Sequence, residues 1–189
     1  MEHNEQQQLA LISEMISTAR KEFSDNSTIY LIWGWAVCIA SLAEFALIQM
    51  GKDYHGIVWL IFIPLALIAQ IVFMVRQKKT ERVKSHLDKM IGYVWIAVGV
   101  SMFVVLSSQN IMQLSTYPVL ILLYGIGTFI SGSMMKLKPM QAGAIGCWVI
   151  GLVTFHAPFE YQLLLLSLSL ILSYIIPGHI LKNRIRQNV

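Results

Sequence analysis

Residues 29–50 read IYLIWGWAVCIASLAEFALIQM, an apolar stretch interrupted by a single acidic residue, Glu44. As a helix this stretch would be about 33 Å long, which is enough to cross a bilayer. The whole chain has the same character, because 56% of its residues are hydrophobic and only 13% are charged. A soluble domain would carry roughly a quarter charged residues. The sequence therefore predicts an integral membrane protein.

Further apolar stretches follow the first, and together they predict an all-α bundle of six transmembrane helices. We expect the spans at residues 29–50, 56–75, 91–106, 118–135, 141–156 and 161–176. Pro177 and Gly178 should end the last span, because proline and glycine commonly stop helices. A transmembrane domain over residues 29–181 leaves a polar segment at 1–28, short connections and a basic tail at 182–189. No soluble catalytic domain is expected.

The segment before the first span has helical periodicity. Its apolar residues recur at spacings of three and four, at Leu9, Ile12, Ile16, Ala19 and Phe23. This pattern predicts an amphipathic helix that lies on the membrane surface, covers the inner ends of the bundle, or docks a partner or a second copy. A basic segment leading straight into an apolar one is missing at the N-terminus, so we expect no cleaved signal peptide.

Positive charge is distributed unevenly between the connections. In a six-span topology, all but one of the 14 Lys and Arg residues fall on the side that holds both termini, and Lys52 is the exception. Because cytoplasmic connections are enriched in Lys and Arg, both termini should be cytoplasmic. The basic connection at 76–89 is expected to meet anionic lipid headgroups rather than nucleic acid.

Three of the predicted spans share a spacing between a tryptophan and a hydroxyl residue six positions later. The pairs are Trp35 with Ser41, Trp95 with Ser101, and Trp148 with Thr154. This spacing favours three repeated helical hairpins. The alternative is coincidence, since tryptophan near a membrane interface and hydroxyl residues within spans are both common.

Small residues recur at helical spacing within the spans and predict where helices approach closely. Close contact in lipid requires small side chains, because water does not drive apolar helices together there. The predicted packing positions are Gly34, Cys38, Ser41, Gly132, Gly143, Cys147 and Gly151. The two cysteines are interpreted as packing residues rather than as a disulfide or redox pair.

The stretch at 122–139, LLYGIGTFISGSMMKLKP, resembles a segment of small uncharacterised bacterial membrane proteins. The resemblance implies a location in the bacterial cytoplasmic membrane. It covers a small part of the chain and transfers no functional residue.

Glu44 is the only formally charged residue inside any predicted span, and it is the first candidate for chemistry. A carboxylate within the bilayer is usually turned inward, protonated or paired. The expected partner is His156, and the other candidates for binding a ligand or proton are Tyr124 and Gln70. Gln70 is equally explained by an interhelical hydrogen bond. Pro64 should kink the second span, either as a hinge or as a packing feature.

Signatures of enzymes are missing from the sequence. The five histidines are scattered, which does not favour a metal site, and no cofactor motif or paired carboxylates stand out. Two hypotheses remain. The first is a non-enzymatic membrane module that acts in interaction, as an accessory subunit or in sensing, with itself or a membrane partner. The second is a small transporter coupled to protons or cations through Glu44.

Overall fold

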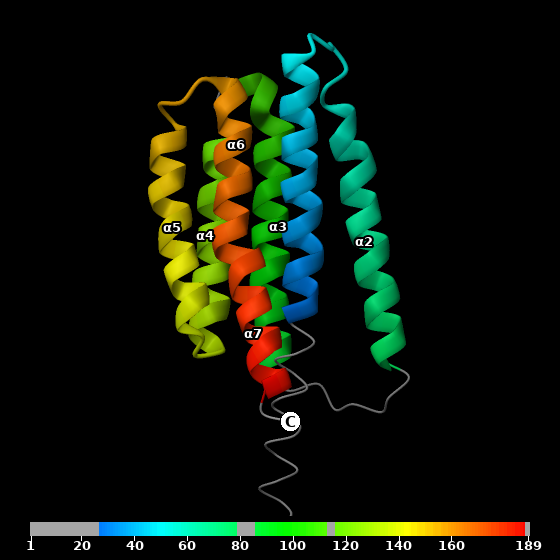
Figure 1. Ribbon diagram of the computed structural model, residues 1–189, viewed down its shortest axis with the longest axis vertical. Coiled ribbons are helices and arrows are strands. Elements are labelled where there is room, and N and C mark those ends of the chain that lie inside the picture. The colour runs from blue at the N-terminus through cyan, green and yellow to red at the C-terminus, as the bar shows by residue number, and fades with distance from the viewer. Residues whose placement is uncertain (1–26, 79–85, 113–115, 188–189) are drawn as a thin grey trace, which may run out of the picture.

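The computed structural model describes residues 27–78, 86–112 and 116–187. Within these residues the fold is all-helical, without strands (Figure 1). Five helical segments are long and apolar enough to cross a membrane: Ser27–Gln49, Ile57–Arg76, Lys89–Ser108, Thr116–Met134 and Phe159–Asn183. The predicted class, an all-helical multi-pass membrane protein, is confirmed at this level. The predicted amphipathic helix at residues 5–23 lies outside the described residues.

The first span, Ser27–Gln49, is followed by four single helices and a composite one. The single helices are α2 (Ile57–Lys78), α3 (His86–Met112), α4 (Thr116–Met134) and α5 (Lys138–Thr154). The last span joins α6 (Phe159–Leu170), the π-helical turn η1 (Ile171–Ile175) and α7 (Ile176–Gln187). Five candidate spans are found rather than six because α5 has only 17 residues. It rises about 25 Å, less than the roughly 30 Å hydrocarbon core of a bilayer.

The last helix does not end at Pro177 and Gly178, contrary to the prediction. It continues through both residues to Gln187. The π-helical turn explains why proline is tolerated here. The backbone N–H of Ile176 bonds to the carbonyl of Ile171, so the regular α-helical ladder is already interrupted. Pro177 follows directly, where its missing N–H costs little.

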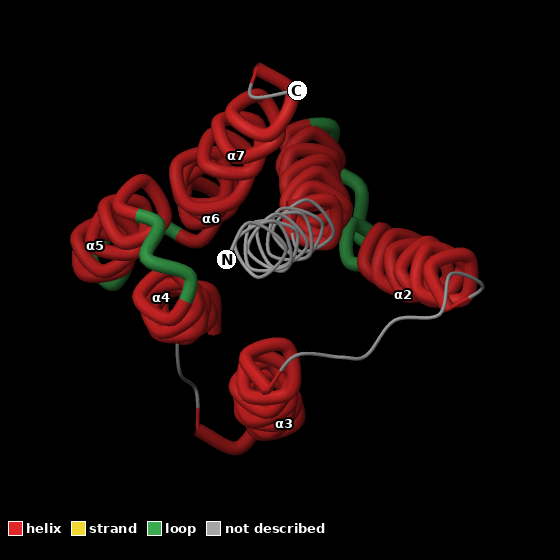
Figure 2. Tube along the Cα trace, turned by 90° about the horizontal axis from the view of Figure 1, so that it is seen from below, coloured by secondary structure: helices red, strands yellow, loops and turns green. Residues whose placement is uncertain are grey.

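The helices stand side by side with their axes roughly along the long axis of the molecule (Figures 1 and 2). Helix α4 packs against α5 and α3, and α5 also packs against α6 and the π-helical turn. The first span lies beside the last: the Ser27 hydroxyl donates to the carbonyl of Gly178 at 2.9 Å, and Ser41 Oγ lies 2.6 Å from Ser167 Oγ. Helix α2 stands at the edge of the bundle, next to the first span.

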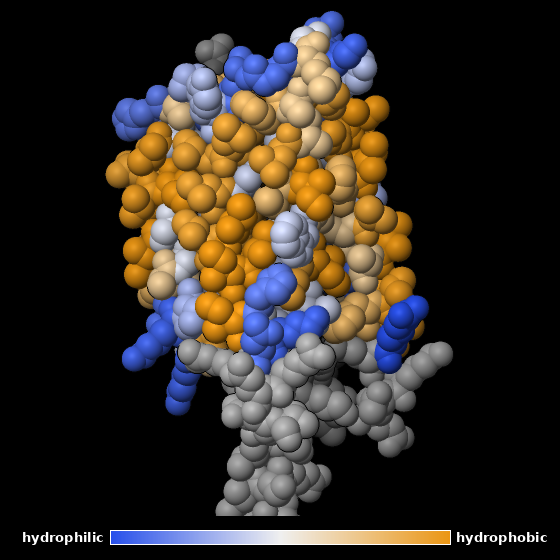
Figure 3. Space-filling model, viewed as in Figure 1, coloured by the Kyte–Doolittle hydropathy of each residue, from blue (hydrophilic) through white to orange (hydrophobic). Residues whose placement is uncertain are grey.

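We call the two ends of the bundle the Ser27 end and the Gly51 end. The Ser27 end also holds the α4–α5 connection, and the Gly51 end holds the α5–α6 connection (Figure 1). Apolar side chains cover the middle of the visible face, and hydrophilic ones gather at both ends (Figure 3). In α2 and in α3, only 11% of the most apolar 18-residue stretch is buried, so both helices expose most of their surface to the surrounding medium. For apolar helices that medium is lipid.

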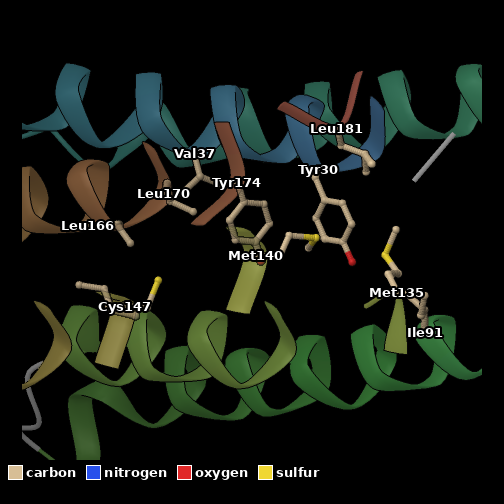
Figure 4. Packing of buried hydrophobic residues seen from close by; sticks show 11 residues of the cluster. Tyr30, Val37, Ile91, Met135, Met140, Cys147, Leu166, Leu170, Tyr174 and Leu181 are labelled. Atoms are coloured by element: carbon tan, nitrogen blue, oxygen red, sulfur yellow. The ribbon is translucent and has the colours of Figure 1, made fainter. Parts of the chain in front are cut away.

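The core lies between the first and last spans on one side and α4, α5 and α3 on the other (Figure 4). Val37, Leu166 and Leu170 are almost completely buried and fill its centre. Toward the Ser27 end the core becomes aromatic. There Tyr30, Trp95 and Tyr174 meet edge to face, with ring centroids 5.6 to 5.9 Å apart.

The tryptophans of the predicted repeat have different surroundings. Trp35 is 47% exposed, whereas Trp95 lies in the aromatic part of the core and Trp148 packs on Phe129. Equivalent spacing in the sequence therefore does not give equivalent environments in the fold.

Several predicted packing positions lie where two helices approach closely. A β-carbon added at Gly34, Gly132 or Gly151 would lie 2.8 to 2.9 Å from a side-chain atom of the neighbouring helix. One added at Gly143 would lie 2.5 Å from the backbone oxygen of Leu172, which is the closest approach of the four. Cys38 and Cys147 are both buried free thiols.

Candidate functional site

Glu44 lies in the first span near the Gly51 end, and its side chain is 3% exposed. Its carboxylate is surrounded by three polar groups from three different parts of the chain. Oε1 lies 2.8 Å from Nδ1 of His55, while Oε2 accepts from Trp59 Nε1 at 2.7 Å and from the Tyr117 hydroxyl at 2.6 Å. We call these four residues the Glu44 cluster. A carboxylate only accepts hydrogen bonds, so His55 presents its Nδ1–H when Glu44 is ionised.

The short connection after the first span brings His55 and Trp59 to Glu44. Gly51 has a φ of +68° and ends the helix, with its N–H bonded to the carbonyl of Ile48. The N–H of Lys52 reaches back to Leu47, which completes a Schellman cap. The chain then turns within a few residues and enters α2, so that a residue one turn into α2 has the same depth as Glu44.

The first turn of α4 supplies Tyr117, and α6 closes the cluster from the side. The ring of Phe159 at the start of α6 lies 6.3 Å from that of His55 and 5.6 Å from that of Tyr117. The rings of Trp59 and Tyr117 are 6.4 Å apart. Glu44 thus connects the first span, the following loop, α2 and α4, and an aromatic side chain of α6 covers the cluster.

An open hollow of about 430 Å³ lies beside the cluster at the Gly51 end. Its lining includes Lys52, Asp53 and His55 from the loop and Pro158, Phe159 and Glu160 from the start of α6. The side chain of His55 is 34% exposed, so the hollow reaches the cluster from the medium. Among the described residues, no group of three or more His, Cys, Asp or Glu side chains is placed to hold a metal ion.

The structure does not bring the expected partner His156 to Glu44. His156 is exposed in the turn after α5, and its Nδ1 lies 3.2 Å from the carbonyl of Leu152 in the last turn of that helix. The prediction rested only on the similar depths of His156 and Glu44 in the membrane. It did not consider the direction in which the His156 side chain points. His156 therefore lies outside the Glu44 cluster.

The other predicted site residues are also apart from Glu44. Tyr124 meets the ring of Tyr174 edge to face at 5.7 Å, deeper in the bundle. Gln70 accepts a hydrogen bond from Trp33 Nε1 at 2.7 Å, which joins α2 to the first span. Pro64 lies inside α2, which continues through it.

Sequence reasoning missed His55, Trp59 and Tyr117. A usable signal was present, since Trp59 follows Glu44 by 15 residues with only a short polar connection between two spans. A short connection makes the two helices that it joins neighbouring and antiparallel. Residues that are equally far from the connection therefore lie at the same depth in the membrane. Tyr117 gave a weaker signal, as an aromatic residue at the predicted start of a span.

No protein-family model, curated protein or solved structure matches this chain. The chemistry of its own residues is therefore the basis for assigning a function.

Proposed function

We propose that this chain is a non-enzymatic membrane module that acts in interaction, as an accessory subunit or in sensing, and that the Glu44 cluster holds the helices together at the Gly51 end. The observation that carries the proposal is that Glu44 is buried and bonded to three other parts of the chain. Both carboxylate oxygens are bonded, one of them twice, and the side chain is 3% exposed. A buried carboxylate held by three other parts of the chain joins helices and offers little surface to a substrate.

The core beneath the cluster supports the same function. Val37, Leu166 and Leu170 are at most 2% exposed and belong to the buried core. The buried hydroxyls of Ser167, Ser169 and Ser173 beside them bond to backbone carbonyls of their own span. A path for protons or ions needs polar groups or water along its length. Close apolar packing, with hydroxyls bonded within their own helix, favours a packed bundle over a transport path.

A second candidate is transport coupled to protons or cations through Glu44. The feature that favours it is the hollow beside His55, since a proton or cation entering there would reach Glu44 through one partly exposed side chain. Transport would require this packed core to open.

Flux measurements on liposomes separate the two candidates. We expect vesicles containing the full chain to hold a pH gradient as long as protein-free vesicles, with Glu44→Gln behaving identically. His156→Gln is the control, because His156 is an exposed titratable residue outside the Glu44 cluster and the hollow. Proton or cation flux that Glu44→Gln abolishes and His156→Gln retains would overturn the proposal in favour of transport. For the interaction role, deleting residues 1–23 should reduce the oligomeric mass or remove copurifying partners.

We further propose that α5 is a sixth span and that the helices cross the bacterial cytoplasmic membrane as three hairpins, with both termini in the cytoplasm. The Ser27 end would then be cytoplasmic and its basic residues would meet anionic headgroups. Support comes from Lys136, Lys138 and Lys182 near the Ser27 end and from Lys52 at the Gly51 end.

Cysteine labelling in intact cells tests this topology. His156→Cys should react with a membrane-impermeant maleimide, and Lys138→Cys should react only after permeabilisation, because the two exposed residues lie at opposite ends of α5. Cys38 and Cys147 are buried and give little background. If both introduced cysteines react from one side, α5 does not cross the membrane.

A further inference from the structure

The hollow beside the Glu44 cluster lies between two short segments that are far apart in the sequence. The connection after the first span forms one wall, through the side chains of Lys52, Asp53 and His55. The start of α6 forms the other, through Phe159 and Glu160. The proposed role as a membrane module leaves this hollow of about 430 Å³ unused.

Side-chain contacts hold the two walls in place. His55 Nδ1 lies 2.8 Å from the buried carboxylate of Glu44, which fixes the imidazole ring at the back of the hollow. Gln49, at the end of the first span, donates to Glu160 Oε2 at 3.1 Å and so joins the first wall to the second. The rings of His55 and Phe159 lie 6.3 Å apart. The hollow is therefore preformed, as most small-ligand sites are.

The hollow presents charges of both signs. Among the described residues, the only ion pair joins His55 to Glu44, so Lys52 and Asp53 have no oppositely charged partner there. Because Nδ1 of His55 faces Glu44, Nε2 of the neutral ring remains as an acceptor. This nitrogen and the carboxylates of Asp53 and Glu160 favour a cation that carries N–H donors. Lys52 favours an anionic group attached to that cation.

The hollow also lies at the depth where spans end. The first span ends at Gln49 and the last begins at Phe159, so the hollow lies where apolar helices meet polar connections. Hydrophilic side chains gather at this end of the bundle (Figure 3). Lipid headgroups lie directly beyond the hydrocarbon core of a bilayer. Phe159 is 50% exposed, in keeping with the enrichment of aromatic residues near that boundary. A lipid headgroup is therefore within reach of the hollow.

The charges select among headgroups. A headgroup with a phosphate and no amine would bring its negative charge to Asp53 and Glu160, and a choline headgroup has no N–H to donate. A primary ammonium can donate to these carboxylates and contact the ring of Phe159, while Lys52 pairs with the adjoining phosphate. We propose that the hollow binds the zwitterionic phosphoethanolamine headgroup of a phospholipid.

Lipid competition on the full chain in detergent tests this site. The chain receives equal amounts of phosphatidylethanolamine, phosphatidylcholine and phosphatidylglycerol with identical acyl chains, and native mass spectrometry counts the lipids retained. We expect phosphatidylethanolamine to exceed phosphatidylcholine about fivefold, the effect of one partly exposed charge pair. This ratio decides, because both headgroups are zwitterionic and respond alike to the net charge of the protein.

Substitutions then locate the preference. Asp53→Asn combined with Glu160→Gln should bring the ratio close to one, and both residues are exposed, so the fold should persist. His156→Gln is the control, because His156 is exposed but does not line the hollow. Equal retention of phosphatidylethanolamine and phosphatidylcholine by the native chain would overturn the proposal. So would a preference that survives the double substitution.

A second measurement places the headgroup and separates a lipid from a soluble zwitterion. In bilayers with isotope-labelled ethanolamine headgroups, we expect solid-state NMR to show magnetisation transfer to His55 and Phe159 and none to Lys182 at the Ser27 end. Soluble glycerophosphoethanolamine at the same concentration should not displace the lipid. Transfer to Lys182 alone, or displacement by the soluble compound, would contradict a headgroup site in the hollow.

Discussion

Replacing Glu44 by alanine should lower the free energy of unfolding by about 3–5 kcal/mol, the largest effect that we expect from one side chain. The substitution leaves the partly buried donors of Trp59 and Tyr117 without an acceptor and removes the partner of His55. Glu44→Gln should cost less, about 1–3 kcal/mol, because the amide keeps the volume and one acceptor oxygen. Denaturant titration in detergent, followed by tryptophan fluorescence, measures both.

Glu160→Ala serves as the matched control for this prediction. Glu160 is exposed and accepts one hydrogen bond, from Gln49 at 3.1 Å. Its loss should change stability by no more than about 0.5 kcal/mol, as is usual for surface positions. Equal effects of Glu44→Ala and Glu160→Ala would show that the Glu44 cluster contributes nothing to holding the helices together.

The second large effect is expected at Gly143, where α5 lies directly against the π-helical turn. A methyl group there would lie 2.5 Å from the backbone oxygen of Leu172 and 2.7 Å from the α-carbon of Ser173. Backbone atoms cannot move aside by changing rotamer, so the two helices must separate. Gly143→Ala should therefore destabilise the fold by about 3 kcal/mol, at the upper end for overpacking, as a drop in Tm.

Gly146 provides a control on the same helix. The nearest atom to an added β-carbon at Gly146 is the flexible Leu172 Cδ1, at 3.8 Å, which is an ordinary contact. Because alanine is favoured over glycine in a helix by up to about 1 kcal/mol, Gly146→Ala should be neutral or stabilising. If both alanine variants behave alike, α5 does not approach the π-helical turn as closely as described.

Hydropathy was sufficient to predict the helices themselves, because a run of apolar residues long enough to cross a bilayer has few alternatives. Each predicted span overlaps a helix. The span predicted at 141–156 overlaps α5, although α5 is short. The end of the last span was wrong. Pro177 and Gly178 are strong signals for the end of a helix, and no residue pattern predicts the π-helical turn that accommodates them.

The Glu44 cluster was only half predictable. Glu44 stood out because placing a charged side chain inside a membrane has a high free-energy cost. Its partners depend on the rotation of each helix about its axis, and depth does not determine rotation. His156 and Tyr117 both belong to the same half of the bundle, yet only Tyr117 points inward to Glu44. An amphipathic pattern would resolve such rotations in water, but spans that are apolar on all sides do not carry one.

The contact between the first and last spans has a consequence for how the protein is made. Ser41 and Ser167 are 126 residues apart in the chain, and Ser27 and Gly178 are 151 apart. At a synthesis rate of about 5–20 residues per second, roughly 6 to 25 s pass between the appearance of Ser41 and that of Ser167. During this time the first span is without its contacts to the last span. The contact between the two spans is therefore completed only after α6 has been made, and a ribosome that stalls before α6 leaves the first span without it.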